Sequence, residues 1–138
     1  MWPVIGIPKG KYNTSSMEAS VDQPSLRRLF ADRIPEARNE FMALPGEASV
    51  YTALYKLYEV TAVLAHQHKI RAVKRCLELA EELLQVDDRK ISNAVCSIYM
   101  FHLITLLDKR DARAEVIHYL LPRALRAEYR RQISTCLP

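Results

Sequence analysis

The stretch Ile91–Leu107 constrains the fold more than any other part of the chain, because it is long, apolar and uninterrupted. It reads ISNAVCSIYMFHLITLL and contains no glycine, no proline and no charged residue. A helix of this composition is apolar on nearly every side, so it needs neighbours on every side. We therefore expect a helical rod at about residues 89–107 that forms the centre of an all-helical domain.

A few polar side chains interrupt this rod. They are Ser92, Asn93, Ser97, His102 and Thr105. At 100° per residue they do not merge into one broad face toward solvent. Because buried polar groups in proteins are hydrogen bonded, we expect them to be internal hydrogen-bonding groups that set how neighbouring helices pack. Function is then expected on the exposed faces of the surrounding helices.

The composition fits one folded domain without strands. The chain has 138 residues, of which 49% are hydrophobic and 26% are charged, and only 3 are glycine. A chain of this length buries a core without help from disulfides or metal ions. We predict one all-α domain at residues 21–138, and we expect residues 1–20 to be a tail or a docked extended segment. An irregular bundle and a short stack of helical hairpins are equally compatible with the sequence.

Proline and capping residues divide the domain into five to seven antiparallel helices joined by short loops. Pro24 suits the first turn of the first helix, and Pro35 must break that helix. Asp87 and Asp88 are suited to cap the central rod. We predict helices at about 25–34, 35–44, 47–65, 70–86, 89–107, 112–121 and 123–138.

The helix expected at 70–86 carries its charges in an unusual order. Its basic residues come early and its acidic residues late: Arg71, Lys74, Arg75, Glu78, Glu81 and Glu82. This order opposes the helix macrodipole and costs about a few tenths of a kcal/mol at each end. Either tertiary partners hold these charges or the order is neutral drift, and we favour drift.

One candidate for partner binding is a strip of tyrosines. Tyr51, Tyr55 and Tyr58 lie at helical spacing beside the apolar stripe of the helix expected at 47–65. Tyrosines at such spacing are most often half-buried at the edge of a core. The alternative is a strip that contacts a partner, since tyrosine combines a large apolar ring with a polar tip.

A second candidate is a basic face on the last helix, made by Arg123, Arg126 and Arg130. The chain has 20 Lys and Arg against 16 Asp and Glu, a net charge of +4, which permits an anionic partner. This excess is smaller than the basic field of a dedicated nucleic-acid-binding protein. A solvated face is the simplest interpretation. If the face binds, an acidic protein surface and nucleic acid are equally compatible with it.

The sequence offers little for catalysis. It contains no HExxH, no glycine-rich phosphate loop and no GxSxG. Cys76, Cys96 and Cys136 are widely spaced, so we interpret them as reduced thiols in a cytoplasmic protein. His66 and His68 lie in an expected turn and cannot share a helix face. We therefore expect no metal, no cofactor and no membrane span.

Arg113 and His118 are separated by four residues in the segment RAEVIH. This spacing resembles the Arg-x4-6-His element of HEPN ribonucleases, in which the two side chains act on the RNA backbone, usually across a dimer interface. Ala114 stands where that family prefers Asn, Asp or His. A match of six residues also arises by chance, so an HEPN-like ribonuclease is an alternative and not our lead hypothesis.

Three further segments carry a wider resemblance. They are the AEELL helix end, the Ser92-Asn93-Ala94-Val95 entry to the rod and the Leu121-Pro122 pair. Together they resemble a small, uncharacterised bacterial family of all-helical cytosolic domains, over about half of the chain. The resemblance implies an all-α fold and no established activity, although small helical proteins of this kind often prove to be interaction modules.

We therefore expect a non-enzymatic protein-binding module. Its most concrete form is a bacterial immunity or antitoxin-type protein that covers a cognate toxin. The expected contacts are Tyr51, Tyr55, Tyr58, Arg123, Arg126 and Arg130, because tyrosine and arginine most often carry interface energy. The alternatives are the HEPN-like ribonuclease and a basic domain that binds nucleic acid through its C-terminal helix.

Overall fold

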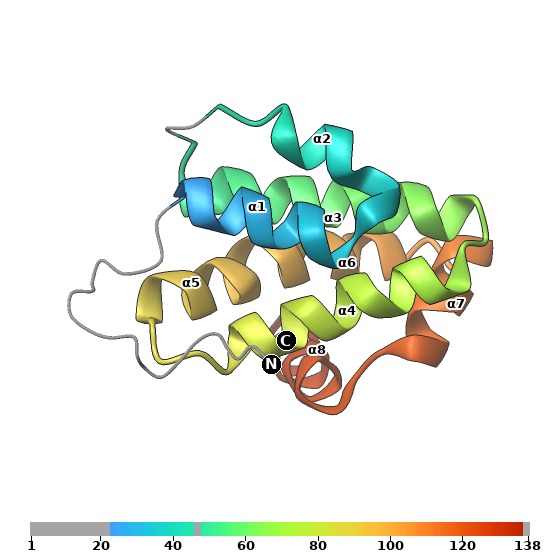
Figure 1. Ribbon diagram of the computed structural model, residues 1–138. Coiled ribbons are helices and arrows are strands. Elements are labelled where there is room, and N and C mark those ends of the chain that lie inside the picture. The colour runs from blue at the N-terminus through green and yellow to red at the C-terminus, as the bar shows by residue number, and fades with distance from the viewer. Residues whose placement is uncertain (1–22, 46–47, 137–138) are drawn as a thin grey trace.

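The computed structural model describes residues 23–45 and 48–136, and all regular structure in these ranges is helical (Figure 1). The helices are α1 (Gln23–Arg33), α2 (Arg38–Met42), α3 (Val50–His66), α4 (Ile70–Leu84), α5 (Arg89–Ala94), α6 (Phe101–Leu107), α7 (Ala112–Leu120) and α8 (Arg123–Cys136). A short 3-10 helix, η1 (Pro35–Ala37), precedes α2, and a π-helical segment, η2 (Val95–Met100), joins α5 to α6. The prediction of an all-α domain is confirmed. The tail predicted at residues 1–20 lies outside the described residues.

The helix boundaries follow local capping chemistry. Asp88 accepts hydrogen bonds from the backbone N–H groups of Lys90 and Ile91, so it caps the rod as predicted. Asp111 accepts from the Ala114 N–H at the start of α7 in the same way. These side chains satisfy donors that have no partner within their own helix, which fixes where each helix begins.

The segment Arg89–Leu107, called the rod from here on, packs against α3, α4, α7 and α8. Helix α3 contacts the rod, α1, α2, α4 and α7, so it occupies a position as central as that of the rod. In Figure 1, α2 and α8 lie on opposite sides of the molecule, with α3 and α4 between them. This arrangement is an irregular bundle, one of the two arrangements compatible with the sequence.

The rod is not buried on every side, which corrects our expectation. Asn93, Ser97, Phe101 and Thr105 are all exposed and follow one another at intervals of four residues. In an ideal α-helix such positions drift around the axis by 40° per step. The π-helical segment takes more residues per turn, so this row stays on one line and forms a continuous exposed stripe.

We expect from the sequence that the polar groups of the rod set how neighbouring helices pack. The polar groups of this stripe do not have that role. The Ser97 hydroxyl donates to the Asn93 carbonyl at 2.6 Å, and the Thr105 hydroxyl donates to the Phe101 carbonyl at 3.2 Å. Both hydroxyls bond within the rod and face solvent. They need no partner from another helix.

Within the described ranges, one helix is long and apolar enough to cross a membrane. It is the rod, Arg89–Leu107, with a mean hydropathy of 1.3. The core helix of a folded domain meets the same criterion of length and composition, and the rod contacts four other helices of this domain.

The rod is fixed to α3 by a buried polar contact. Tyr99 lies in the π-helical segment with no exposed surface, and its hydroxyl lies 2.9 Å from the hydroxyl of Thr61. Thr61 also donates to the Leu57 carbonyl at 2.7 Å, which leaves the Tyr99 hydroxyl as the donor to Thr61. Burial raises the pKa of Tyr99, so its phenol stays neutral.

Three of the six charges of α4 have partners on other elements, so our preference for neutral drift was wrong for these three. Glu82 forms a bidentate ion pair with Arg33 of α1, with N–O distances of 3.0 and 2.5 Å. Arg75 pairs with Glu36 of η1. Glu81 accepts hydrogen bonds from the backbone N–H groups at the start of α8. These charges therefore tie α4 to α1, η1 and α8.

We predict that Glu81→Ala lowers the free energy of unfolding by about 1–2 kcal/mol. Both Glu81 carboxylate oxygens accept at 2.9 Å, one from the Ala124 N–H and the other from the Leu125 N–H. The substitution leaves these two donors at the start of α8 without that acceptor. Urea denaturation followed by circular dichroism measures the change. Glu78→Ala on the same helix is the control and should change stability by less than about 0.5 kcal/mol; equal losses would contradict the capping role of Glu81.

The turn between α3 and α4 ends in a left-handed residue that is not glycine. His68 has φ 57°, the Lys69 N–H donates to the Leu64 carbonyl, and the His68 N–H donates to the Ala65 carbonyl. These two bonds form a Schellman motif, in which the left-handed position is usually glycine. His68 therefore holds a conformation that is unfavourable for a side chain with a Cβ atom.

We predict that His68→Gly raises the free energy of unfolding by about 0.5–1 kcal/mol, because glycine adopts positive φ without this steric cost. Thermal or urea denaturation measures the change. Gln67→Gly is the matched control, since Gln67 has φ −83° and gains nothing from glycine there. We expect Gln67→Gly to be destabilising. A loss of stability in His68→Gly would show that the histidine side chain contributes more than the strain costs.

Candidate functional site

Two tyrosines of the strip on α3, Tyr55 and Tyr58, contact His102 of the rod, and Tyr51 lies one helical turn before Tyr55 on the same side of α3. The Tyr55 ring lies 4.9 Å from the His102 ring, and the Tyr58 ring lies 5.3 Å from it, measured between ring centroids. The Phe101 ring packs edge-on against His102 at 5.3 Å. We call the group Tyr51, Tyr55, Tyr58, Phe101 and His102 the aromatic face.

The aromatic face consists of three exposed rings and two half-buried rings beneath them. Tyr51, Tyr55 and Phe101 keep 44%, 40% and 58% of their surface exposed, whereas Tyr58 and His102 are half-buried. Spacing alone favoured the interpretation that these tyrosines are half-buried at the edge of the core. Tyr51 and Tyr55 are more exposed than that. Tyr55 and Phe101 are linked through their shared contact with His102, and exposed apolar rings gathered in this way are typical of interaction sites.

A hydrogen bond within the rod holds His102 in place. The His102 Nδ1 atom lies 2.8 Å from the Ile98 carbonyl oxygen. A carbonyl oxygen only accepts, so Nδ1 carries the proton in this contact. Burial raises the pKa of Tyr58, while the nearby positive charge of Arg113 acts in the opposite direction. Tyr58 is therefore a neutral phenol at physiological pH.

Arg113 and His118 face different neighbours within the chain. The Arg113 guanidinium donates to the Asp111 carboxylate at 2.9 Å and lies near Tyr58 of α3. The His118 ring packs edge-on against Tyr129 of α8, with a centroid distance of 5.4 Å. The two side chains do not converge in one chain. The HEPN-like alternative, which would bring two such pairs together in a dimer, stays a prediction.

The predicted basic face on α8 divides into residues with different roles. Arg126 donates from Nη2 to the carbonyls of His118 and Leu121, at 3.2 and 3.0 Å. It therefore satisfies acceptors at the end of α7, a structural role that the sequence did not indicate. Arg123 and Arg130 are exposed, so they are the members of this face presented to solvent.

The two described cysteines are poor nucleophiles. Burial raises the pKa of the Cys76 thiol to about 12, and burial together with the Glu128 carboxylate raises the pKa of the Cys96 thiol to about 11. Only the thiolate reacts readily, and little of it forms at neutral pH. Cys76 and Cys96 are free cysteines. Within residues 23–45 and 48–136, no group of three or more His, Cys, Asp or Glu is placed to hold a metal ion.

Sequence reasoning missed Phe101 and His102 as members of the site. Both lie in the stretch that we expected to be buried, where an aromatic residue and a histidine are ordinary core residues. The only available signal was the position of Phe101 within the row of four-residue spacings from Asn93 to Thr105, which does not include His102. That row becomes one face only because the rod contains a π-helical segment.

A family model described as "Domain of unknown function (DUF7674)" matches residues 27–135. The match spans the chain from α1 to α8 and includes every residue of the aromatic face. No curated protein and no solved structure matches the chain. The predicted resemblance to an uncharacterised domain family is confirmed.

We predict that Cys76 and Cys96 react at least about tenfold more slowly with a disulfide reagent in the folded protein than after unfolding in urea, at about pH 8. Their raised pKa values keep both thiols protonated at that pH, whereas unfolding restores ordinary values. The measurement is the rate at which the disulfide reagent releases its own thiol, made on a Cys136→Ser variant so that only Cys76 and Cys96 react. A folded Cys96 that reacts as fast as the unfolded chain would mark it as a candidate nucleophile.

Proposed function

The chain belongs to the DUF7674 family, whose function is unknown, and we propose that it is a non-enzymatic protein-binding module. The observation that carries the proposal is the aromatic face, where Tyr51, Tyr55 and Phe101 present exposed rings from two different helices. Tyrosine and phenylalanine are enriched at the centre of protein interfaces, where a few side chains supply most of the binding energy.

The support beneath this surface favours recognition of a partner in one fixed geometry. His102 contacts Tyr55, Tyr58 and Phe101 at once, and its ring is held by the Ile98 carbonyl. Side chains that are already ordered lose little conformational entropy when a partner binds. The face is thus suited to cover a matching apolar surface.

In its most concrete form, the proposed partner is a toxin, and the protein is an immunity or antitoxin-type protein of the bacterial cytoplasm. The mechanism would be occlusion, in which a rigid helical scaffold covers the active site of the toxin. The exposed Arg123 and Arg130, together with the net charge of +4, suit an acidic partner surface.

The chemistry of the described residues favours binding over catalysis. The raised pKa values of Cys76 and Cys96 argue against thiolate chemistry. Arg113 and His118 face different helices, so a single chain does not assemble them into one reactive site. An enzyme needs such groups to converge, whereas a binding module does not.

We predict that the double variant Tyr55→Ser, Phe101→Ser loses a stoichiometric protein partner that the wild-type protein retains from its host. Each ring is a candidate for the centre of the interface, and loss of one such residue costs at least about 2 kcal/mol, or roughly 30-fold in affinity. Affinity purification with quantitative mass spectrometry identifies the partner, and calorimetry with the purified partner measures the loss. Growth rescue in cells that express the partner then tests whether it is a toxin.

Val63→Ser is the matched control, because Val63 is a further apolar residue of α3, 53% exposed, that lies outside the aromatic face. Its partner binding should equal that of the wild type. Both variants change exposed positions, so their unfolding free energies should stay within about 0.5 kcal/mol of the wild type for each substitution. Equal binding by the folded double variant would overturn the assignment of the aromatic face. Recovery of no stoichiometric partner would count against the proposed function itself.

A further inference from the structure

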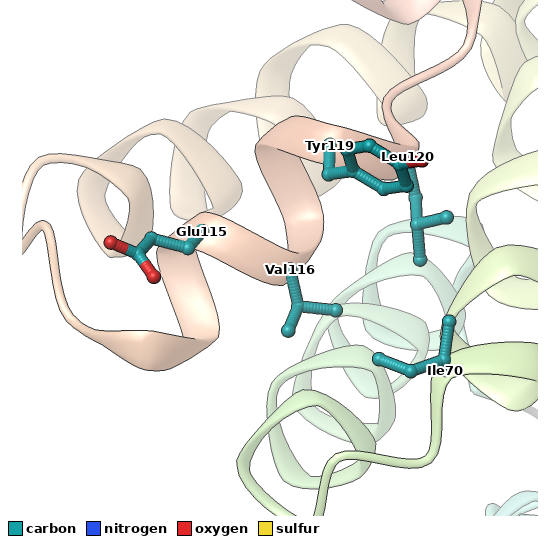
Figure 2. A pocket seen from close by; sticks show the side chains of 5 residues that line it. All are labelled: Ile70, Glu115, Val116, Tyr119 and Leu120. Carbon is teal, nitrogen blue, oxygen red and sulfur yellow. The ribbon is translucent and has the colours of Figure 1, made fainter.

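A second apolar surface lies between the first turn of α4 and helix α7. In Figure 2, Val116 and Leu120 of α7 point across a gap toward Ile70 of α4, with Tyr119 beside them and Glu115 at the far end. The gap is a groove of about 320 Å³ that is open to solvent. None of its lining residues belongs to the aromatic face.

The groove is bordered by apolar groups that remain in water. Ile70 is 43% exposed and Tyr119 is 86% exposed, the largest exposed fraction among the exposed large hydrophobic residues of the described ranges. The Tyr119 ring makes so little contact with its own chain that packing against it contributes little to the stability of the fold. Apolar side chains that converge on an open groove are typical of a surface that another molecule covers.

The α4 side of the groove carries positive charge. The segment from His66 to Leu77 contains four Lys or Arg residues and no carboxylate. Arg75 pairs with Glu36, and the charge of Lys69 also acts on Glu36. Arg71 and Lys74 are exposed.

Arg71 follows Ile70 directly, and Lys74 lies one helical turn after it on the same face. Lys74 therefore lies beside Ile70 on the α4 side of the groove, and Arg71 is a second exposed cation in the same turn of α4. The carboxylate that lines the groove, Glu115, lies at its far end on α7.

We propose that this groove binds an acidic segment of a partner protein, which inserts an apolar side chain between Ile70, Val116 and Leu120. The carboxylates of that segment face Arg71 and Lys74. A second copy of this chain, with a net charge of +4, suits the basic edge of the groove less well than an acidic segment does. The groove is also open and near the lower end of the roughly 300–1000 Å³ typical of small-molecule sites.

The test is a titration of the isotope-labelled protein, followed by amide chemical shifts, with two synthetic amphipathic peptides of equal length. One peptide combines leucine with glutamate, and the other combines the same leucines with lysine. We expect the acidic peptide to shift the amide signals of Ile70, Arg71, Val116 and Leu120, and to bind at least about tenfold more tightly than the basic peptide.

Two variants separate the apolar contribution from the electrostatic one. Ile70→Ser with Tyr119→Ser removes apolar surface, and Arg71→Glu with Lys74→Glu reverses the basic edge. Each pair should weaken binding of the acidic peptide at least about tenfold, and only the loss caused by charge reversal should shrink at high salt. Tyr51→Ser, on the aromatic face, is the control and should bind the acidic peptide like the wild type.

Several outcomes would overturn the proposal. They are equal binding of both peptides, shifts confined to other surfaces, unchanged binding by the folded variants, or no shift at millimolar peptide. Self-association that Ile70→Ser abolishes would instead assign the groove to a second copy. Tighter binding of an RNA oligonucleotide or of anionic vesicles at these residues would assign it to another class of partner. Because the aromatic face is tested by different variants, this proposal and the proposed function can fail separately.

Discussion

The hydrogen bond between the hydroxyl groups of Thr61 and Tyr99 fixes the position of the rod against α3. Tyr99 is fully buried, and an unpaired hydroxyl in the core would cost about 1–3 kcal/mol. A shift of the rod by one residue would break this bond and leave the Tyr99 hydroxyl without its partner. With Tyr99 turned inward, Phe101 and His102 lie on the outer side of the rod beside Tyr55. The geometry of the aromatic face therefore depends on a polar contact in the core.

Helix α4 shows how tertiary contacts outweigh a local preference. Carboxylates near its C-terminus oppose its own macrodipole by about a few tenths of a kcal/mol. Glu81, however, lies at the N-terminus of α8, where two backbone N–H groups donate to it and the dipole of α8 favours a negative charge. Loss of both hydrogen bonds is expected to cost about 1–2 kcal/mol, so the contact with α8 exceeds the local cost.

The features that the sequence predicts well are those set by neighbouring residues. Asp88 caps the rod because its side chain reaches the next backbone N–H groups, and Pro35 ends α1 because of its own ring. The exposed row from Asn93 to Thr105 was not predictable, because it requires a π-helical segment that no local rule places there. The structural role of Arg126 was also not predictable, because its acceptors lie at the end of another helix, α7. Three of the five residues of the candidate site, the tyrosines, follow from helical spacing, and the other two, Phe101 and His102, require the tertiary arrangement.

The π-helical segment links contacts made by α3 and α8 to the outward face of the rod. A π-helical turn hydrogen bonds less favourably than an α-helical one and persists where other contacts stabilise it. Here the side chain of Gln132 on α8 donates to the Cys96 carbonyl at 2.9 Å, and Tyr99 bonds to Thr61. Both contacts hold the segment from outside the rod. Because that segment determines which residues of α6 face outward, α3 and α8 together determine the surface that the rod contributes to the aromatic face.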